Sequence, residues 1–296
     1  METVRAQIEP LSEFGTPLRG DTLFGQICWT IALLDGEERL KSLLDDYDRN
    51  PFLIVSDPFP PGLLPKPAMP YFQLGEDPEE RKINRDKRWI SMSDLKAGRF
   101  NEALSNHEAG LGDVSTVTLH NSLDYRSFKT GGAQFAPFGE KRYLLGKKEI
   151  YLMFDRSKAA SEDVHRWLEA VGLYGYGKDA SIGKGRYSLV ETETVELPME
   201  GERFMTLSPA SLEGVEAVNV RYRPMTRFGK HGGKRARGKV FKKPLLLADT
   251  GAVLDFDSPR TLPYAGKAIR GHSSAHPDTV HQGYAVTVAI GKGDAS

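Results

Sequence analysis

Several features of common protein classes are missing from this sequence. Its 296 residues include a single cysteine, Cys28, which excludes an internal disulfide and indicates a reducing compartment. No apolar run approaches the ~20 residues that a membrane-spanning helix needs, and the N-terminal METVRAQIEP lacks the basic and apolar regions of a signal peptide. We therefore expect a soluble, cytoplasmic protein without a membrane partner, and we interpret Cys28 as a small buried hydrophobic residue.

The chain also lacks net charge, because 40 lysines and arginines balance 40 aspartates and glutamates. Overall charge therefore gives no indication of a nucleic-acid partner, and only the local distribution of charge is informative. Hydrophobic residues make up 39% of the chain, which is enough for the cores of one large domain or two small ones.

The segment GYGKDASIGKGRY, residues 175–187, is rich in glycine and positive charge, with four glycines, two lysines and one arginine. It matches the dinucleotide pattern G-x-G-x-x-A, but it follows a predicted helix and enters a predicted strand, the reverse of that motif. It also fails the phosphate-loop pattern, because Gly185 follows Lys184 where serine or threonine is required. A helix C-cap explains one or two of the glycines. We interpret the remainder as a backbone cradle for an anion.

Two other segments combine positive charge with aromatic residues. Residues 221–243 hold ten lysines and arginines and no acid, and they lie between two strand patterns, which favours a hairpin with a basic tip. Residues 120–148 also mix cations with tyrosines and phenylalanines. Each segment has an alternative interpretation as an ordinary solvated loop. Three such segments on a neutral chain favour binding of single-stranded nucleic acid.

The hydrophobic pattern predicts an α+β fold. Up to residue 198 the elements follow the order β-α-β-β-α-β of a ferredoxin-like unit, interrupted by an insertion at 58–148. Residues 199–296 are strand-rich and are expected to form a second domain. The expected strands of the first unit lie within 3–8, 51–60, 148–155 and 185–197, and its helices within 21–34, 37–47 and 161–173. Asp21 is the expected N-cap of the first helix.

Within the insertion, local composition predicts mostly irregular structure. Six prolines at 58–70 predict an extended connector, and the charged residues 76–108 have a helical character. Residues 114–119 read as a strand, and 120–148 as loops.

Four blocks of the sequence together identify a family resemblance. They are the N-terminal FGTPLRGDTLFGQICW, the proline-rich DPFPPGLLPKPAMP with the later HNSLDYRSFKTGG, the glycine-rich YGYGKDASIGKGRYS, and the C-terminal VFKKPLLLADTGAVL with HQGYAVTVAI. The sequence resembles the RAMP superfamily of CRISPR-associated proteins, and within it the fourth, Cas5-like subunit of the type III-A (Csm) effector complex. The resemblance runs from end to end.

The resemblance implies a fold and a role. The fold is two ferredoxin-like (RRM-related) domains, at 1–198 and 199–296, with long loop insertions and a glycine-rich loop. The role is that of a non-catalytic, RNA-binding subunit of an antiviral ribonucleoprotein, without cofactor or metal, that holds the repeat-derived 5′ tag of the crRNA. The implied partners are the large subunit that produces cyclic oligoadenylate and the backbone RAMP subunit. A hairpin "thumb" that kinks the guide is expected at 120–148, with 76–108 as second choice.

The charge pattern and the resemblance together give the expected RNA contacts, with Asp21 regarded more as a helix cap than as an RNA ligand. These contacts are Arg19, Thr22, His120, Asn121, Arg126, Lys129, Lys178, Ser181, Gly183, Lys184, Gly185, Arg186, Lys230, Lys234 and Arg235.

Two other functions stay open. A repeat-cleaving endoribonuclease of the same superfamily would need a general base, and His120 and His231 are the histidines that lie in basic segments. A protein adaptor would use the basic segments for acidic partners. His272, His276 and His281 are closely spaced, but without a fourth ligand we expect no metal site there.

Overall fold

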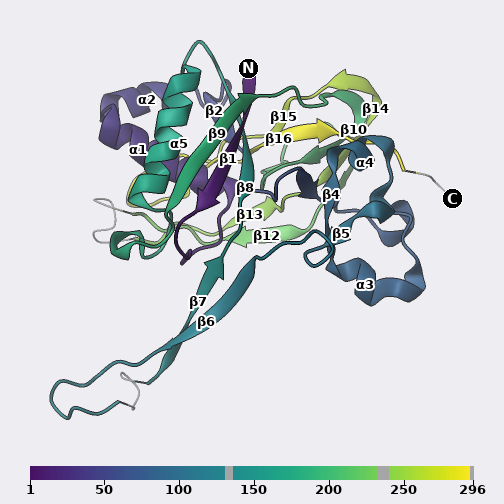
Figure 1. Cartoon of the computed structure of the whole chain (residues 1–296). Coiled ribbons are helices and arrows are strands. Elements are labelled where there is room, and N and C mark those ends of the chain that lie inside the picture. Colours follow the sequence, from purple (N-terminus) through teal and green to yellow (C-terminus); the bar gives the residue numbers. More distant parts are fainter. Residues whose placement is uncertain (131–135, 233–239, 294–296) are drawn as a thin grey trace.

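A four-stranded antiparallel sheet forms the first half of the protein (Figure 1). The structure is a computed structural model of the chain, and it describes residues 1–130, 136–232 and 240–293. Along the sheet the order is β2-β8-β1-β9, formed by β1 (Glu2–Pro10), β2 (Leu53–Val55), β8 (Lys148–Phe154) and β9 (Tyr187–Thr194). In chain order, β1, β2, β8 and β9 are the four strands of the predicted unit. Strands β3–β7 lie in the stretch of chain between β2 and β8.

Helices cover one face of this sheet (Figure 1). They are α1 (Gly20–Leu34), α2 (Glu37–Asp45) and α5 (Ser161–Tyr174). The face is apolar because alternate residues of β1, Val4, Ala6 and Ile8, point into the core. Gly20 is needed where α1 begins, since a Cβ there would lie 2.5 Å from the carbonyl oxygens of Val55 and Ser56.

The stretch between β2 and β8 contains more strand than its composition predicts. Strand β3 (Leu63–Pro65) lies in the expected irregular connector, and β4 (Lys87–Ser91) and β5 (Leu104–Ser105) lie in the expected helical segment. These expectations were wrong there because buried apolar side chains pair across the sheet, as Leu64 does with Ile90. The short helices around this sheet are η1 (Tyr71–Gln73), η2 (Pro78–Glu80), α3 (Arg81–Asp86), α4 (Met92–Ala97) and η3 (Phe100–Glu102).

A long two-stranded hairpin follows and projects from the body of the molecule (Figure 1). It consists of β6 (Val114–His120) and β7 (Phe138–Leu144), paired over seven residues. The strand expected at 114–119 is confirmed. The segment 120–148, expected to be loop-rich, contains strand β7, because Phe138–Leu144 pairs with β6 and forms the second arm of the hairpin.

The second half is strand-rich, as predicted. Its main sheet has the order β11-β14-β10-β16-β15. The strands are β10 (Glu200–Thr206), β11 (Asn219–Arg221), β14 (Val253–Thr261), β15 (Tyr264–Gly266) and β16 (Tyr284–Ala289), and a separate hairpin pairs β12 (Pro224–Arg227) with β13 (Leu245–Ala248). The described part of 199–296 contains no helix, so the two helices of a second β-α-β-β-α-β unit are not seen in it.

The two halves share one hydrophobic core. The main buried cluster joins Val55 and Leu152 of the first sheet to Met205 and Val286 of the second. The buried Gln282 side chain reinforces this junction. Its Oε1 accepts a hydrogen bond from the Val55 N–H and its Nε2 donates one to the Val55 carbonyl, both at 2.8 Å. The packing therefore fixes how the two sheets lie relative to each other.

Candidate nucleic-acid interface

The segment 11–19 lies between the hairpin and the glycine loop and holds both in place. Phe14 exchanges two backbone hydrogen bonds with Tyr143 of β7, at 2.9 and 3.0 Å. On the other side, the Gly185 N–H donates to the Glu13 carbonyl at 2.8 Å. Phe14, Tyr143 and Gly185 are far apart in the sequence, but these bonds bring them together near Tyr143, at the neck of the hairpin. They belong to, or lie beside, three of the four blocks that carried the family resemblance.

Ion pairs join the same three segments through their side chains. Glu140 of β7 accepts hydrogen bonds from Lys178 and from Lys184, the latter at 3.3 Å. Arg142, also on β7, donates to Glu13 at 2.6 Å. The hydrogen bond from Lys178 is the main reason that the pKa of Glu140 falls to about 2, although partial desolvation opposes it. The carboxylates of Glu13 and Glu140 therefore clamp the hairpin to the glycine loop.

The backbone conformation of the loop explains its glycines. Gly175, Gly177, Gly183 and Gly185 all have positive φ, between 71° and 93°. A Cβ on Gly185 would lie 2.1 Å from the Tyr176 carbonyl oxygen, and one on Gly177 would lie 2.9 Å from Thr16. The number of glycines in the loop therefore does not require a bound anion, because the loop's own backbone conformation and close contacts account for them. Gly183 alone of the four has open space around it.

Only part of the predicted cradle faces solvent. Lys178, Ser181 and Arg186 are exposed, whereas Lys184 is 6% exposed and Gly185 is buried. The ammonium of Lys184 lies 3.0 Å from Asp179, a hydrogen bond that raises the pKa of Lys184. Lys184 is thus placed as an internal counter-ion that shapes the loop, and Lys178 and Arg186 as its accessible cations.

The hairpin tip carries exposed cations and exposed rings. Arg126 and Lys129 are exposed there, as is Asn121. Tyr125 is 84% and Phe128 is 75% exposed. The turn between them is ordered by Asp124, which accepts hydrogen bonds from the Arg126 N–H and the Ser127 hydroxyl, both at 2.8 Å. Two rings and the Arg126 guanidinium on one ordered turn are suited to stacking on unpaired bases.

His120 is the last residue of β6, opposite Phe138, and lies where the paired arms end and the tip begins. Its ring stacks on Phe138 with centroids 5.5 Å apart, and its Nε2 lies 3.2 Å from an Arg142 nitrogen. The other candidate base, His231, is buried, with Nε2 2.7 Å from the Ser273 hydroxyl. Both imidazoles are therefore engaged by neighbouring side chains.

Residues at the start of α1 bond to residues of both halves and so help to join the halves. Arg19 donates to Asp57 at 2.7 Å and to Asp249 at 3.0 Å. The prediction that Asp21 is the helix N-cap was wrong, because α1 begins one residue earlier and Arg19 occupies the cap position. Asp21 is instead buried and accepts two hydrogen bonds from Arg227 of β12. Thr22 follows it and is half-buried.

The described residues on either side of 233–239 pair as the predicted hairpin. β12 and β13 pair, and an isolated bridge between Lys230 and Phe241 extends them toward the tip. The Lys230 ammonium lies 4.9 Å from the centre of the Phe241 ring, a cation–π contact. Phe228 is 72% exposed beside them. Lys234 and Arg235 lie outside the described residues.

Other candidate chemistries find little support in the described part of the chain. There, no group of three histidine, cysteine, aspartate or glutamate side chains is arranged to hold a metal ion. Burial raises the pKa of Cys28 to about 12, so its thiol is not activated as a nucleophile. A search of the same residues finds no helix with the length and apolar character needed to cross a membrane.

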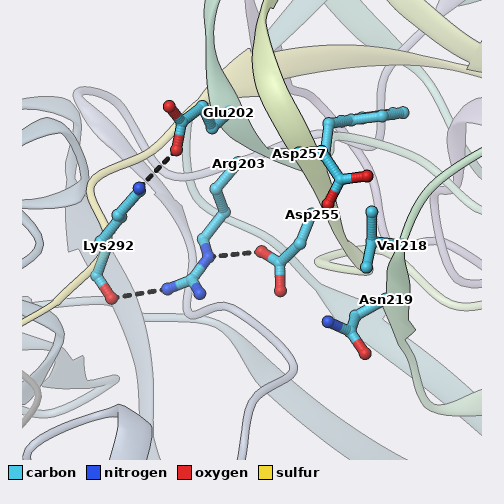
Figure 2. A pocket seen from close by; sticks show the side chains of 8 residues that line it. Glu202, Arg203, Val218, Asn219, Asp255, Asp257 and Lys292 are labelled. Atoms are coloured by element: carbon cyan, nitrogen blue, oxygen red, sulfur yellow. Dashed lines mark hydrogen bonds and ion pairs between the residues drawn. The ribbon is translucent and has the colours of Figure 1, made fainter.

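A polar pocket of about 260 Å³ lies on the second sheet, away from these segments (Figure 2). Figure 2 shows Arg203 donating to Asp255 and to the Lys292 carbonyl, both at 2.6 Å, while the Lys292 ammonium pairs with Glu202. Both cations in this pocket are therefore already paired within it.

No family model and no curated protein matches the sequence. Solved structures do match its fold. A chain in the crystal structure of a Csm1–Csm4 cassette with cA4 aligns with a TM-score of 0.62 and 14% identity, covering 98% of both chains. A chain in the cassette with AMPPNP aligns with a TM-score of 0.60 and 17% identity over the same shares.

A third match connects these to another assembly. A chain in the crystal structure of the Csm3–Csm4 subcomplex of the type III-A CRISPR–Cas interference complex aligns with a TM-score of 0.57 and 15% identity. The alignment covers 98% of the present chain and 100% of the other. Csm4 is the component that all three assemblies share. The resemblance seen in the sequence is thus confirmed at the level of the fold: along nearly its whole length, the chain has the fold of the chains aligned in these Csm1–Csm4 and Csm3–Csm4 structures.

Proposed function

We propose that the chain is a non-catalytic, RNA-binding subunit of a type III-A CRISPR effector complex. In this proposal it holds the 5′ tag of the crRNA and bridges the large, cyclic-oligoadenylate-producing subunit to the backbone RAMP subunit. The fold supports the assignment, since the solved chains that share it are crystallised with Csm1 and with Csm3.

One observation carries the RNA-binding part of the proposal. The projecting hairpin has exposed cations and rings at its tip, and its neck is clamped to a loop that presents Lys178 and Arg186 to solvent. Single-stranded RNA offers unstacked bases and phosphates, which such rings and cations bind. The tip would act on the bases, and the loop on phosphates elsewhere along the same strand.

The assignment of a binding role without cleavage has its own support. A general base must reach the proton that it abstracts, with a free lone pair. His231 is buried. His120 Nε2 lies 3.2 Å from an Arg142 nitrogen and 3.5 Å from a Glu140 carboxylate oxygen, so the atom that would take the proton is already held between two charged side chains. Neither arrangement favours proton abstraction from a ribose hydroxyl.

Sequencing the RNA that co-purifies with the assembled complex tests the proposal and identifies the tag. The labelled tag RNA is then titrated with the purified chain and with the double variant Tyr125→Ala/Phe128→Ala. We expect binding to weaken by about 1–3 kcal/mol for each base that loses its stacking partner. A double variant on α2, Arg39→Ala/Lys41→Ala, serves as the control, since α2 lies far from the hairpin (Figure 1).

Two results would overturn the proposal. The first is the absence of repeat-derived RNA from the complex, or tag binding that is equal in the tip variant and the control. The second is cleavage of the RNA by the chain alone, lost in His120→Ala or in His231→Ala, which would support the endoribonuclease alternative.

A further inference from the structure

Strand β9 presents an unused edge of the first sheet. One side of β9 pairs with β1, and no other strand in the described part of the chain pairs with its opposite side. Figure 1 shows β9 beside β1 and next to α5. Its last five residues, 190–194, are all exposed, and Val190 is 46% exposed. An exposed edge of this kind offers a row of unpaired backbone donors and acceptors.

The strand register identifies which backbone groups point outward. The Val195 N–H donates to the Thr3 carbonyl at 3.0 Å, while Val4 lies opposite Thr194. In an antiparallel ladder this makes Val4 and Thr194 a non-hydrogen-bonded pair, and alternation makes Ala6 and Thr192 the next such pair. The N–H and carbonyl groups of Thr192 and Thr194 therefore point away from β1, toward the open edge.

The sheet face next to this edge is acidic. Tyr187–Glu200 contains four glutamates and no lysine or arginine. Glu191 and Glu193 lie opposite Gln7 and Arg5, so they share the face of the sheet that α1 and α5 do not cover. Arg5 pairs with Glu193 at 2.6 Å and with Glu149 at 3.5 Å, which leaves three carboxylates against one guanidinium on this face.

Helix α5 adds acids on the other side of the edge. His165 Nδ1 lies 3.2 Å from the Thr192 hydroxyl, which places this side of the helix beside β9. Glu162 and Glu169 are three residues before and four residues after His165, so they lie on the same side of the helix, and both are exposed. The edge therefore runs between two rows of glutamates.

We propose that the outer edge of β9 binds an extended, lysine- and arginine-rich segment of another protein by strand addition. Backbone bonds would form with Thr192 and Thr194. Residues of the incoming strand opposite Glu191 and Glu193 would occupy non-hydrogen-bonded positions, where side chains approach closely, so the segment carries its cations at alternate positions. A nucleic acid is disfavoured because carboxylates repel phosphates, and a second copy because like charges would face each other across the new ladder.

The test uses the full chain and two labelled peptides of about ten residues, one alternating lysine with threonine and the other alternating glutamate with threonine. Fluorescence anisotropy reports binding. We expect the lysine peptide to bind and the glutamate peptide not to. Glu191→Gln/Glu193→Gln weakens binding about fivefold by removing two partly exposed ion pairs. Thr192→Pro weakens it by a similar factor, because it removes an outward N–H without removing a bond to β1.

Thr192→Val is the matched control, since it keeps the N–H, and it binds the lysine peptide as the unchanged chain does. Hydrogen exchange on the unchanged chain gives an independent readout if Thr192→Pro does not fold: the peptide slows exchange at the amides of Thr192 and Thr194. Equal binding of both peptides, equal binding by Thr192→Pro and Thr192→Val, or unchanged exchange at those two amides would each overturn the proposal. The proposal would also be overturned if the chain self-associated and Thr192→Pro abolished that self-association.

Discussion

Arg227 of β12 donates two parallel hydrogen bonds to the carboxylate of Asp21 of α1, at 2.7 and 2.8 Å, although the two residues are 206 positions apart in the chain. Asp21 is fully enclosed, and His281 lies 3.4 Å from the same carboxylate. Burial alone would raise the pKa of Asp21, but His281 and Arg227 outweigh it and lower the pKa to about 2. The pair connects the N-terminal helix to the C-terminal half of the chain.

We expect Asp21→Asn to destabilise the fold by about 3 kcal/mol, because it leaves the Arg227 guanidinium facing an amide with no counter-charge. Urea unfolding measures the loss. The double variant Asp21→Asn/Arg227→Met should recover part of it, since the unpaired cation is removed as well. Equal stability of Asp21→Asn and the unchanged chain would show that the pair contributes nothing.

Acid should weaken the fold through two carboxylates. Asp21 and Glu140 both have pKa values near 2 in the folded protein, below their ordinary values of 3.8 and 4.5. A depressed pKa stabilises the fold above the ordinary value, and this stability is lost as pH falls through the folded value. Urea midpoints between pH 5 and about 2 should therefore fall, and fall less steeply in Glu140→Gln. A pH dependence identical in the variant would remove Glu140 from this explanation.

Two glycines of the loop provide a matched pair. Gly185 and Gly183 both have positive φ, but a Cβ on Gly185 would meet the Tyr176 carbonyl, whereas Gly183 has open space. We expect Gly183→Ala to lose about 1 kcal/mol from its backbone strain alone. Gly185→Ala should lose more than about 3 kcal/mol, since backbone must also move. Thermal unfolding ranks the two, and similar losses would contradict the close approach.

The cations of the same loop should separate binding from folding. Arg186→Ala removes an exposed cation and should weaken tag RNA binding by about 1–3 kcal/mol, with a shallower salt dependence. Lys184→Ala should act on stability, because it leaves the carboxylates of Asp179 and Glu140 without their shared cation. RNA titrations and unfolding curves on all variants decide this. The result that contradicts it is weaker binding for Lys184→Ala alone, at unchanged stability.

Periodicity made the first sheet and its helices predictable. Val4, Ala6 and Ile8 alternate in β1, and Leu23, Ile27 and Ile31 recur in α1, because each element buries one face of its own. Strand β7 escaped prediction because none of its residues is fully buried and the half-buried ones include Glu140 and Arg142, so no apolar alternation marks it. Its pairing with β6 became visible only in three dimensions.

The cations of the candidate site stand out in the sequence, and its acids do not. Basic, glycine-containing segments identified Lys178, Arg186 and the hairpin tip. Glu13 and Glu140 carried no signal, since their partners are distant in sequence. For the same reason the sequence did not indicate that Lys184 pairs with Glu140, 44 residues earlier, or that Asp21 pairs with Arg227, 206 residues later.

The anchoring of the hairpin at one end gives it mechanical leverage. Its two arms of seven residues span roughly 23 Å at about 3.3 Å per residue, while Glu140, Arg142 and Tyr143 hold it near the body. A sideways load on the tip acts as a torque on these anchors, and thus on the glycine loop bonded to them. Bending of the tip would therefore reach the glycine loop through the contacts of Glu140 before it reached the buried core.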